Sequence, residues 1–272
     1  MSQSRRKRKA PRRSPSYEAI GQFYDSLWLD NPRAWTAARS RLLEPIVSGA
    51  RRVCELGCGT GVTAMEFARR GLKVFALDYS REMCRVTREK ALAEGLDVQV
   101  ARGDMRTFRL PVKVDLVTSE WGVINHLRRK AELAQTFRAV ARAVKPGGYF
   151  FFDLHQQKLY EEGWPKAVIG DGVTAEEGKK FFAAQHGGYD RKNGKGWTEI
   201  TIFVRRAGGL WQRRGERIEE ICWSQGEIVR DLKRAGFQLL RVCDFADICA
   251  APSPKRGPDG MRTMYLARLK SR

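Results

Sequence analysis

Short apolar segments recur at regular intervals along the first half of the chain. They occupy residues 52–56, 73–78, 97–104, 113–121 and 149–155 and are rich in Val, Leu and Phe. The stretches between them, for example 129–144, space their apolar residues as amphipathic helices do. Strands that alternate with helices are typical of a parallel sheet. The pattern therefore predicts an α/β, Rossmann-like fold with helices on both faces of the sheet.

This rhythm breaks in the middle of the chain. Residues 156–222 hold extended, partly alternating segments separated by Gly, Asp and Asn turns, which predicts an antiparallel β insert. A helix with Ser224 as its N-cap and Gly236 at its end follows. Two last strands are expected over 238–245 and 262–269. With these two, the mostly parallel sheet has seven strands.

The N-terminal part differs from both of these regions. Residues 1–16 are basic, contain two prolines and are expected to be disordered. A helix is expected from Tyr17 onward, and a second one over 32–47 after a turn at Asn31-Pro32. The sequence thus divides into a basic tail, a core and an insert placed as a lid over the core, with the bounds 1–16, 17–155 plus 223–272, and 156–222.

The first predicted strand runs into a glycine-rich turn, VCELGCGTG at 53–61. Gly57, Gly59 and Gly61 precede a helix that starts near Val62. Glycine is needed where the backbone takes positive φ values and comes close to a ligand. The dinucleotide fingerprint G-x-G-x-x-G would require a third glycine at the position of Val62, so that motif is not met. A glycine turn without any ligand is the alternative.

Glu55 is the residue that points to a particular ligand. A carboxylate two positions before the first glycine would oppose a pyrophosphate at the helix N-terminus and would attract a cation instead. S-adenosylmethionine is a nucleoside that carries an ammonium and a sulfonium group and no phosphate. The spacing E-x-G-x-G-x-G therefore suits this cofactor better than a dinucleotide.

These residues resemble motif I of the class I S-adenosylmethionine-dependent methyltransferases. The resemblance covers most of residues 17–269 and includes the turn Lys145-Pro146-Gly147-Gly148 before the fifth strand. It implies that Asp78, at the end of the second strand, accepts the ribose hydroxyls, as its position after the glycine turn also suggests. Asp104 and Met105, after the third strand, match the adenine position. The other expected cofactor contacts are Glu55, Gly57, Cys58, Gly59, Gly61, Tyr79, Glu120 and Tyr17.

His126 is the first candidate for a catalytic group. It follows the fourth strand in the segment GVINHL, and a neutral imidazole there could accept a proton from an attacking group. A histidine that merely packs is the alternative. Tyr24 is a second candidate, because the pair Tyr24-Asp25 resembles a segment that covers the cofactor pocket in related enzymes. His155 ranks lower, and His186 is expected on the surface of the insert.

Composition sets the outer limits on function. The chain has 272 residues and a formal net charge of +20, and residues 5–13 alone supply seven basic side chains. Such a charge could attract nucleic acid, although a solubilising tail is the preferred interpretation. No apolar run long enough for a membrane or a signal peptide is seen. Six cysteines without a C-x-x-C pair indicate reduced thiols and a cytoplasmic protein, and three scattered histidines indicate no metal.

We therefore expect an S-adenosylmethionine-dependent methyltransferase that acts on a nitrogen or oxygen of a small molecule. Within the superfamily the chain is similar to the amino-sugar and amino-acid N-methyltransferases. It lacks the N/D-P-P-Y/F tetrad of amino-adenine methylation and the Pro-Cys nucleophile of cytosine C5 methylation. Two alternatives stay open: a methyltransferase acting on RNA or another anionic macromolecule, and a non-catalytic cofactor- or nucleic-acid-binding protein.

Overall fold

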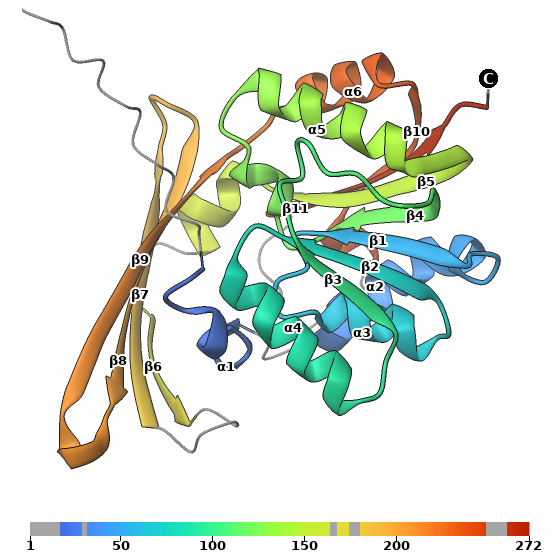
Figure 1. Cartoon of the computed structure of the whole chain (residues 1–272). Helices are drawn as coiled ribbons and strands as arrows, with labels where there is room; N and C mark the ends of the chain where they lie inside the picture. The colour runs from blue at the N-terminus through green and yellow to red at the C-terminus, as the bar shows by residue number, and fades with distance from the viewer. Residues whose placement is uncertain (1–16, 29–31, 164–167, 174–179, 249–259, 272) are drawn as a thin grey trace, which may run out of the picture.

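A central sheet of seven strands forms the larger part of the molecule (Figure 1). The computed structural model describes residues 17–28, 32–163, 168–173, 180–248 and 260–271. In spatial order the strands are β10-β11-β5-β4-β1-β2-β3, and β5, β4, β1, β2 and β3 run parallel, whereas β11 pairs antiparallel with β5 and β10. Their bounds are β1 Arg52–Leu56, β2 Lys73–Asp78, β3 Val98–Arg102, β4 Val114–Ser119, β5 Val144–His155, β10 Phe237–Asp244 and β11 Arg262–Leu269.

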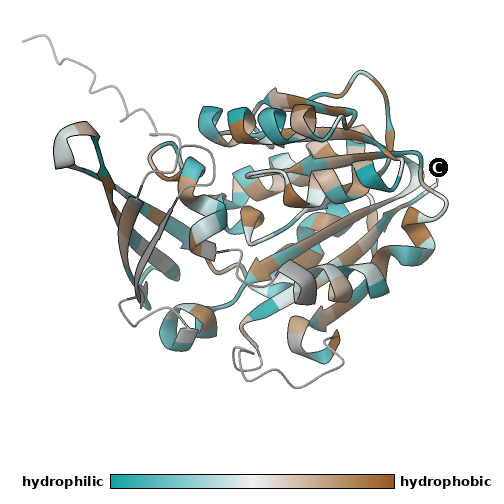
Figure 2. Cartoon of the chain, turned by 90° about the horizontal axis from the view of Figure 1, so that it is seen from below, coloured by the Kyte–Doolittle hydropathy of each residue, from teal (hydrophilic) through white to brown (hydrophobic). Residues whose placement is uncertain are grey.

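Helices bury both faces of this sheet. The apolar side chains of α2 and α3 pack with Val53 and Val74 on one face, and those of α5 and α6 pack with Cys54 and Phe150 on the other. Figure 2 shows the resulting pattern, with hydrophobic strands between helices whose outer sides are hydrophilic. The helices are α1 Tyr24–Trp28, α2 Pro32–Val47, α3 Val62–Arg69, α4 Arg81–Ala93, α5 Lys130–Ala143, α6 Gln225–Arg234 and α7 Phe245–Ile248.

A second, antiparallel sheet of four strands stands beside the first (Figure 1). Its strands are β6 Val168–Val173, β7 Lys180–Asp190, β8 Lys195–Arg205 and β9 Trp211–Ile221, in that spatial order. The N-terminal segment packs against its inner face, where Ile20 and Phe23 join Phe181, Ile200 and Ile202 in a separate apolar cluster. The N-terminal segment therefore links the insert to the core.

The predicted α/β fold, with a mostly parallel sheet and an antiparallel insert after the fifth strand, is confirmed. The predicted helix from Tyr17 is wrong in its first part. Residues 17–20 form a turn, Gly21–Phe23 a 3₁₀ turn, and the α-helix begins only at Tyr24. Tyr17 has a φ of 71°, which no α-helix contains, and Ile20 and Phe23 are buried against the second sheet. Tertiary packing thus overrides the local helical pattern.

Other predicted boundaries hold to within a few residues. Ser224 caps α6 in a capping box with Glu227, and Gly236 follows the helix with a φ of 92°. The segment 145–148 is not a plain turn, because β5 already begins at Val144, and the irregular pairing with β4 is absorbed there with Gly147 at a φ of 77°. The expected disordered tail, 1–16, lies outside the described residues. Among those described, no helix is both long and apolar enough to cross a bilayer.

Candidate active site

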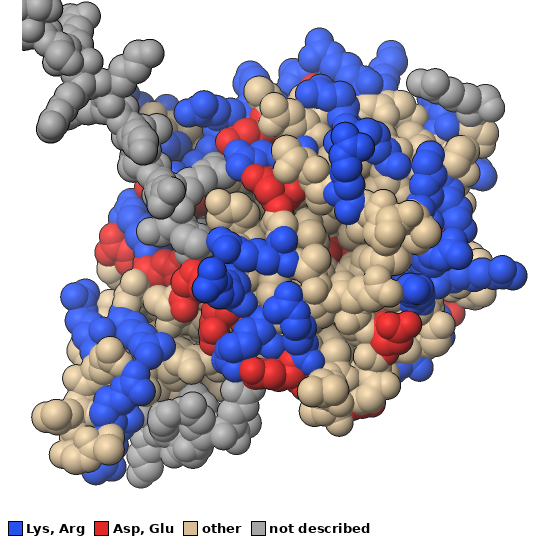
Figure 3. Space-filling model, in the orientation of Figure 1, with Lys and Arg blue, Asp and Glu red and all other residues tan. Residues whose placement is uncertain are grey.

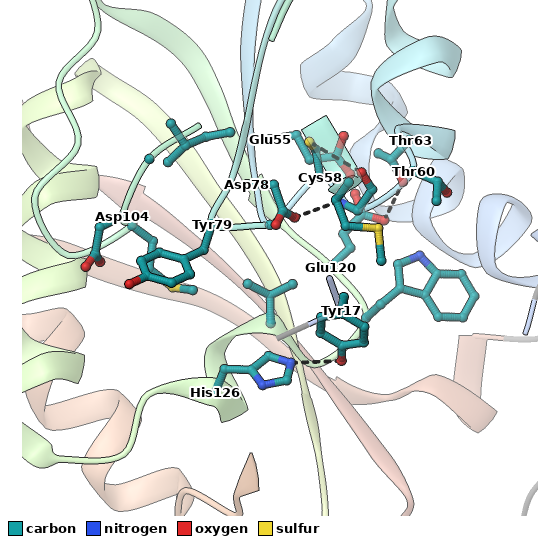
Figure 4. A pocket seen from close by; sticks show the side chains of 18 of the residues that line it. Tyr17, Glu55, Cys58, Thr60, Thr63, Asp78, Tyr79, Asp104, Glu120 and His126 are labelled. Atoms are coloured by element: carbon teal, nitrogen blue, oxygen red, sulfur yellow. Dashed lines mark hydrogen bonds between the residues drawn. The ribbon is translucent and has the colours of Figure 1, made fainter. Parts of the chain in front are cut away.

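A pocket opens at the C-terminal edge of the parallel strands (Figure 4). Its walls come from the ends of β1, β2, β3 and β4, from the N-terminal segment and from β9 of the second sheet. Of the residues expected from the sequence to form the site, all but one line this pocket. They are Tyr17, Tyr24, Glu55, Gly57, Cys58, Gly59, Asp78, Tyr79, Asp104, Met105, Glu120 and His126. Gly61 instead precedes α3 as its N-cap residue.

The glycine turn has the backbone that the sequence predicts. Gly57, Gly59 and Gly61 have φ values of 68°, 53° and 83°. A Cβ on Gly57 would lie 2.4 Å from a methyl carbon of Val123, whereas a Cβ on Gly59 would meet no atom within 4 Å. Gly57 therefore allows close packing of two loops. Gly59 leaves open space beside the backbone, where a ligand can approach.

Two buried carboxylates, Glu55 and Glu120, form the floor of the pocket. Each has one oxygen, Glu55 Oε2 and Glu120 Oε1, without a hydrogen-bond partner among the described residues. Burial, with the neighbouring Glu120 as the next cause, raises the pKa of Glu55 well above its ordinary value. Burial also raises the pKa of Glu120, against the lowering effect of Arg39. Unpaired buried acceptors are costly, so this floor is suited to a ligand that brings positive charge or hydrogen-bond donors.

Sequence reasoning did not find the residues that hold Glu120 in place. The guanidinium of Arg39 donates to Glu120 Oε2 at 3.2 Å and to Thr63 Oγ1 at 3.0 Å, and the Trp35 indole also donates to Glu120. Arg39 is only 2% exposed and also pairs with Glu66. The sequence did indicate that Arg39 is buried, because its helical spacing places it on the apolar face of α2 with Trp35, Ala38, Leu42 and Leu43.

Asp78 and Asp104 lie at the ends of β2 and β3, as expected. Asp78 accepts the N–H of Gly59 at 2.9 Å and that of Ser80 at 2.8 Å, so it holds the glycine turn against the end of β2. Burial raises the pKa of Asp78 to about 6, against the lowering effect of these backbone hydrogen bonds. Asp104 accepts hydrogen bonds from the backbone and guanidinium of Arg106, which also pairs with Glu132.

The remaining expected residues differ in their exposure. The thiol of Cys58 is buried, and burial raises the pKa of this thiol well above its ordinary value, so it stays protonated. Tyr79 is 42% exposed and has the Arg102 guanidinium 5.8 Å from its ring centroid, which places it at the rim. Met105 packs against the core beneath the pocket.

His126 ends a 3₁₀ turn, Val123–His126, and faces the N-terminal segment (Figure 4). Its Nε2 lies 3.2 Å from the hydroxyl of Tyr17 and 3.3 Å from Glu220 Oε1. The Tyr17 ring meets the rings of both His126 and Tyr24 edge to face. Tyr17 and His126, which are 109 positions apart in the sequence, thus meet at one side of the pocket.

Glu220 is a second residue that the sequence analysis missed. It lies near the end of β9 and is 3% exposed. The signal was its position two residues after the buried Ile218, because alternate residues of a strand share a face. His155, ranked low from the sequence, is buried beside it, whereas His186 is about half exposed, as expected for the surface of the insert.

Comparison with known proteins identifies the class to which this fold and pocket belong. Residues 53–148 match the methyltransferase domain family. A protein from Geobacillus sp. (strain WCH70) named as a methyltransferase is 25% identical over 89% of this chain and 97% of its own length. A second such protein, YqeM of Bacillus subtilis (strain 168), is 27% identical over 85% of this chain and 90% of its own length.

Solved structures share the fold along almost the whole chain. An S-adenosylmethionine-dependent methyltransferase from Clostridium acetobutylicum ATCC 824 superposes with a TM-score of 0.72 at 22% identity, covering 94% of this chain and 99% of that one. The sugar N-methyltransferase KedS8 from Streptoalloteichus sp. ATCC 53650 superposes with a TM-score of 0.70 at 20% identity, covering 97% of this chain and 99% of that one.

The protein is thus a methyltransferase of the Rossmann-like type. Residues 53–148 carry the methyltransferase domain, and the cofactor that the sequence predicts for such an enzyme is S-adenosylmethionine. The pocket fits this cofactor on the chemistry of its side chains. The unpartnered oxygens of Glu55 and Glu120 provide acceptors for an ammonium group, and the open space at Gly59 allows a close approach to the turn.

Proposed function

We propose that the enzyme methylates a nitrogen or oxygen atom of a small molecule. The observation that carries this proposal is that three separate parts of the chain line one pocket. Tyr17 and Tyr24 from the N-terminal segment and Glu219 from β9 line the same cavity as Glu55 and Asp78. A pocket that the insert and the N-terminal segment narrow in this way suits an acceptor small enough to enter it.

The cofactor half of the pocket is assigned as follows. Glu55 holds the ammonium end, with Glu120 beside it, Asp78 accepts the ribose hydroxyls, and Asp104 with Met105 takes the adenine. S-adenosylmethionine supplies an electrophilic methyl group on a very good leaving group. The protein has therefore chiefly to position the acceptor atom and to remove its proton.

His126 is the proposed base. Its imidazole lies in the wall of the pocket and is held from one side by Tyr17 and Glu220. When the acceptor nitrogen or oxygen forms its bond to the methyl carbon, the proton of that N–H or O–H passes to the imidazole. Burial raises the pKa of Tyr17 well above its ordinary value, so the phenol acts in its neutral form as a hydrogen-bonding and orienting group.

Labelled-methyl transfer tests the proposal directly. The full chain is incubated with methyl-labelled cofactor and, in parallel, with a pool of small amines and alcohols and with mixed RNA, and the labelled product is identified by mass. Label in a small molecule is the expected result. Label in RNA alone would overturn the small-molecule assignment, and binding of cofactor without any transfer to either pool would favour a non-catalytic role.

A further inference from the structure

Glu220 is the place where the second sheet reaches into the site of the first. It extends from β9 between two histidines of the core, with Oε1 3.3 Å from His126 Nε2 and Oε2 3.3 Å from His155 Nδ1. The hydroxyl of Tyr160 also donates to Oε2. A carboxylate that is 3% exposed needs such partners, and all three lie 60 or more positions before Glu220 in the chain.

The proton on His155 can be assigned from its other neighbour. A terminal nitrogen of Arg262 lies 2.8 Å from His155 Nε2. A guanidinium only donates hydrogen bonds, so Nε2 must present its lone pair and the ring proton must sit on Nδ1. His155 therefore donates Nδ1–H to Glu220 Oε2. Together with Tyr160, it supplies two donors to one oxygen of the carboxylate.

This leaves the second oxygen of Glu220 directed at His126. A lone pair on His126 Nε2 would face the negative oxygen at 3.3 Å, which is unfavourable, whereas an N–H there makes a charge-assisted hydrogen bond. Burial alone would raise the pKa of the Glu220 carboxyl, but the His155 and His126 rings and the hydrogen bonds from His155 and Tyr160 lower it to about 2. Glu220 is thus ionised at any pH at which the enzyme works.

We propose that Glu220 is a positioning residue that pairs with His126 and makes it a stronger base for the methyl-transfer reaction. The inference rests on the proposed role of His126. The carboxylate holds the ring by its Nε2–H, so that the lone pair, which is the basic site of the neutral ring, lies on Nδ1. It also stabilises the positive charge that the ring carries once it is protonated, because an opposite charge at this distance favours the charged form.

The other charged and titratable groups around His126 act less directly. Tyr17 and Tyr24 approach from the N-terminal segment, Glu219 lines the same pocket from β9, and Arg128 follows two residues later in the chain. Behind Glu220 stand His155, Tyr160 and Arg262, which form the contacts described above. Of all these groups, Glu220 is the carboxylate for which the structure shows a contact with the ring.

The support for Glu220 is built into the fold. Gly196 on β8 is the residue paired with Glu220, and a Cβ at Gly196 would lie 2.2 Å from the Tyr160 ring. Glycine at this position lets Tyr160 lie flat on the strand and reach the carboxylate. The pair Glu220–His126 therefore requires the insert to be docked on the core, which makes the insert part of the catalytic apparatus as well as a cover.

Imidazole titration by NMR tests the inference on the resting, full-length enzyme. The chain has only three histidines, so each ring signal can be assigned from the corresponding histidine variant. In Glu220→Gln, which keeps the size and loses the charge, we expect the midpoint of the His126 titration to fall by about 1 pH unit. The acid limb of kcat/KM for the acceptor should move to lower pH by the same amount.

The exposed pair His186–Glu199 provides a matched control. Its Nε2–Oε2 distance is also 3.3 Å, but it lies on the outer surface of the second sheet. Glu199→Gln should leave the His126 midpoint unchanged. Tyr160→Phe removes a donor from Glu220 and keeps its charge, so the midpoint should instead rise, which gives a second reading if Glu220→Gln does not fold.

The outcomes separate the two proposals. An unchanged His126 midpoint in Glu220→Gln, or a fall in Tyr160→Phe, would overturn the pairing whatever the acceptor is. A shifted midpoint with no methyl transfer to any small molecule would leave the pairing standing as a property of the site and would refute the proposed function. A shifted midpoint with an unmoved kcat/KM profile would refute the catalytic part of this inference.

Discussion

The guanidinium of Arg39 lies 3.2 Å from the carboxylate of Glu120, and both side chains are buried. Arg39 is the cation that compensates the buried charge of Glu120. Glu55 lies on the same floor of the pocket and interacts with Glu120. An ion pair of this kind adds little over an apolar pair of the same shape. Its importance is that neither partner can be removed alone.

Replacement of Arg39 by Met should therefore destabilise the protein by about 3–5 kcal/mol, because it leaves the charge of Glu120 buried without its counterion. The loss is measured by urea unfolding of the ligand-free protein. Arg69→Met is the matched control, since Arg69 and Glu94 form an exposed pair that should contribute at most about 1 kcal/mol. The double variant Arg39→Met, Glu120→Gln should recover part of the loss, and equal losses in the single and double variants would contradict this account.

Asp78 should make cofactor binding depend on pH. Only the ionised carboxylate offers strong acceptors to two ribose hydroxyls, and burial raises its pKa to about 6. The affinity for S-adenosylmethionine should thus be constant above pH 7 and should fall as the pH falls through about 6. Calorimetry across this range measures the effect. Asp78→Asn should bind more weakly and show no such fall.

Asp78→Ala should lose more affinity for S-adenosylmethionine than Asp78→Asn, because the Asp78 side chain also accepts the N–H groups of Gly59 and Ser80. Each lost hydrogen bond to the charged group costs roughly 1.5–3 kcal/mol. Wild-type affinity in this variant would refute the assignment of the ribose to Asp78.

His126→Ala should lower kcat about 10²–10⁴-fold, the usual contribution of a positioned base. Cofactor affinity should stay nearly the same, because the acidic floor and Asp78 are untouched. His126→Asn keeps a hydrogen bond and lacks the basicity, which separates positioning from proton transfer, and His186→Ala on the outer sheet is the control. If both His126 variants kept the wild-type kcat on the true acceptor, the residue would be a packing histidine, and Tyr17 and Tyr24 would be tested next.

Gly196→Ala should destabilise the protein by about 1–3 kcal/mol, since the new methyl group would overlap the buried ring of Tyr160. Thermal unfolding measures the loss. Gly226→Ala is the opposite case, because that glycine lies in α6 with no atom within 4 Å of a Cβ, and it should stabilise by up to about 1 kcal/mol. Equal effects of the two changes would show that the packing at Gly196 is not as tight as described.

Deletion of residues 1–16 should leave turnover of a small acceptor unchanged. The prediction follows from the several carboxylates that line the pocket, whereas Lys and Arg side chains are spread over the outer surface seen in Figure 3. Activity is compared at low and moderate salt. A large loss at moderate salt that is recovered at low salt would favour an anionic macromolecule as the acceptor, since screening weakens long-range attraction to the tail.

The sequence alone determined the edge of the sheet at which we place the cofactor. Strands, glycine turns and helix caps depend on neighbours in the chain, so β1, β2 and β11 could be predicted to the residue, and Glu55, Asp78 and Asp104 could be placed at strand ends. Parallel strands bring those ends to one edge of the sheet, which makes a pocket there a consequence of the pattern. Burial of both faces likewise follows from the helical spacing of apolar residues.

Only the tertiary structure decided the acceptor side. Tyr17 meets His126 across 109 positions of sequence, and Glu220 meets His155 across 65, on elements whose relative placement no local pattern encodes. The same holds for Arg39, whose partner Glu120 lies 81 positions away. Whether a charged side chain can be buried depends on its partners, because an unpaired charge stays in water or is neutralised. Which acid meets which base is therefore settled when the insert and the N-terminal segment pack onto the core.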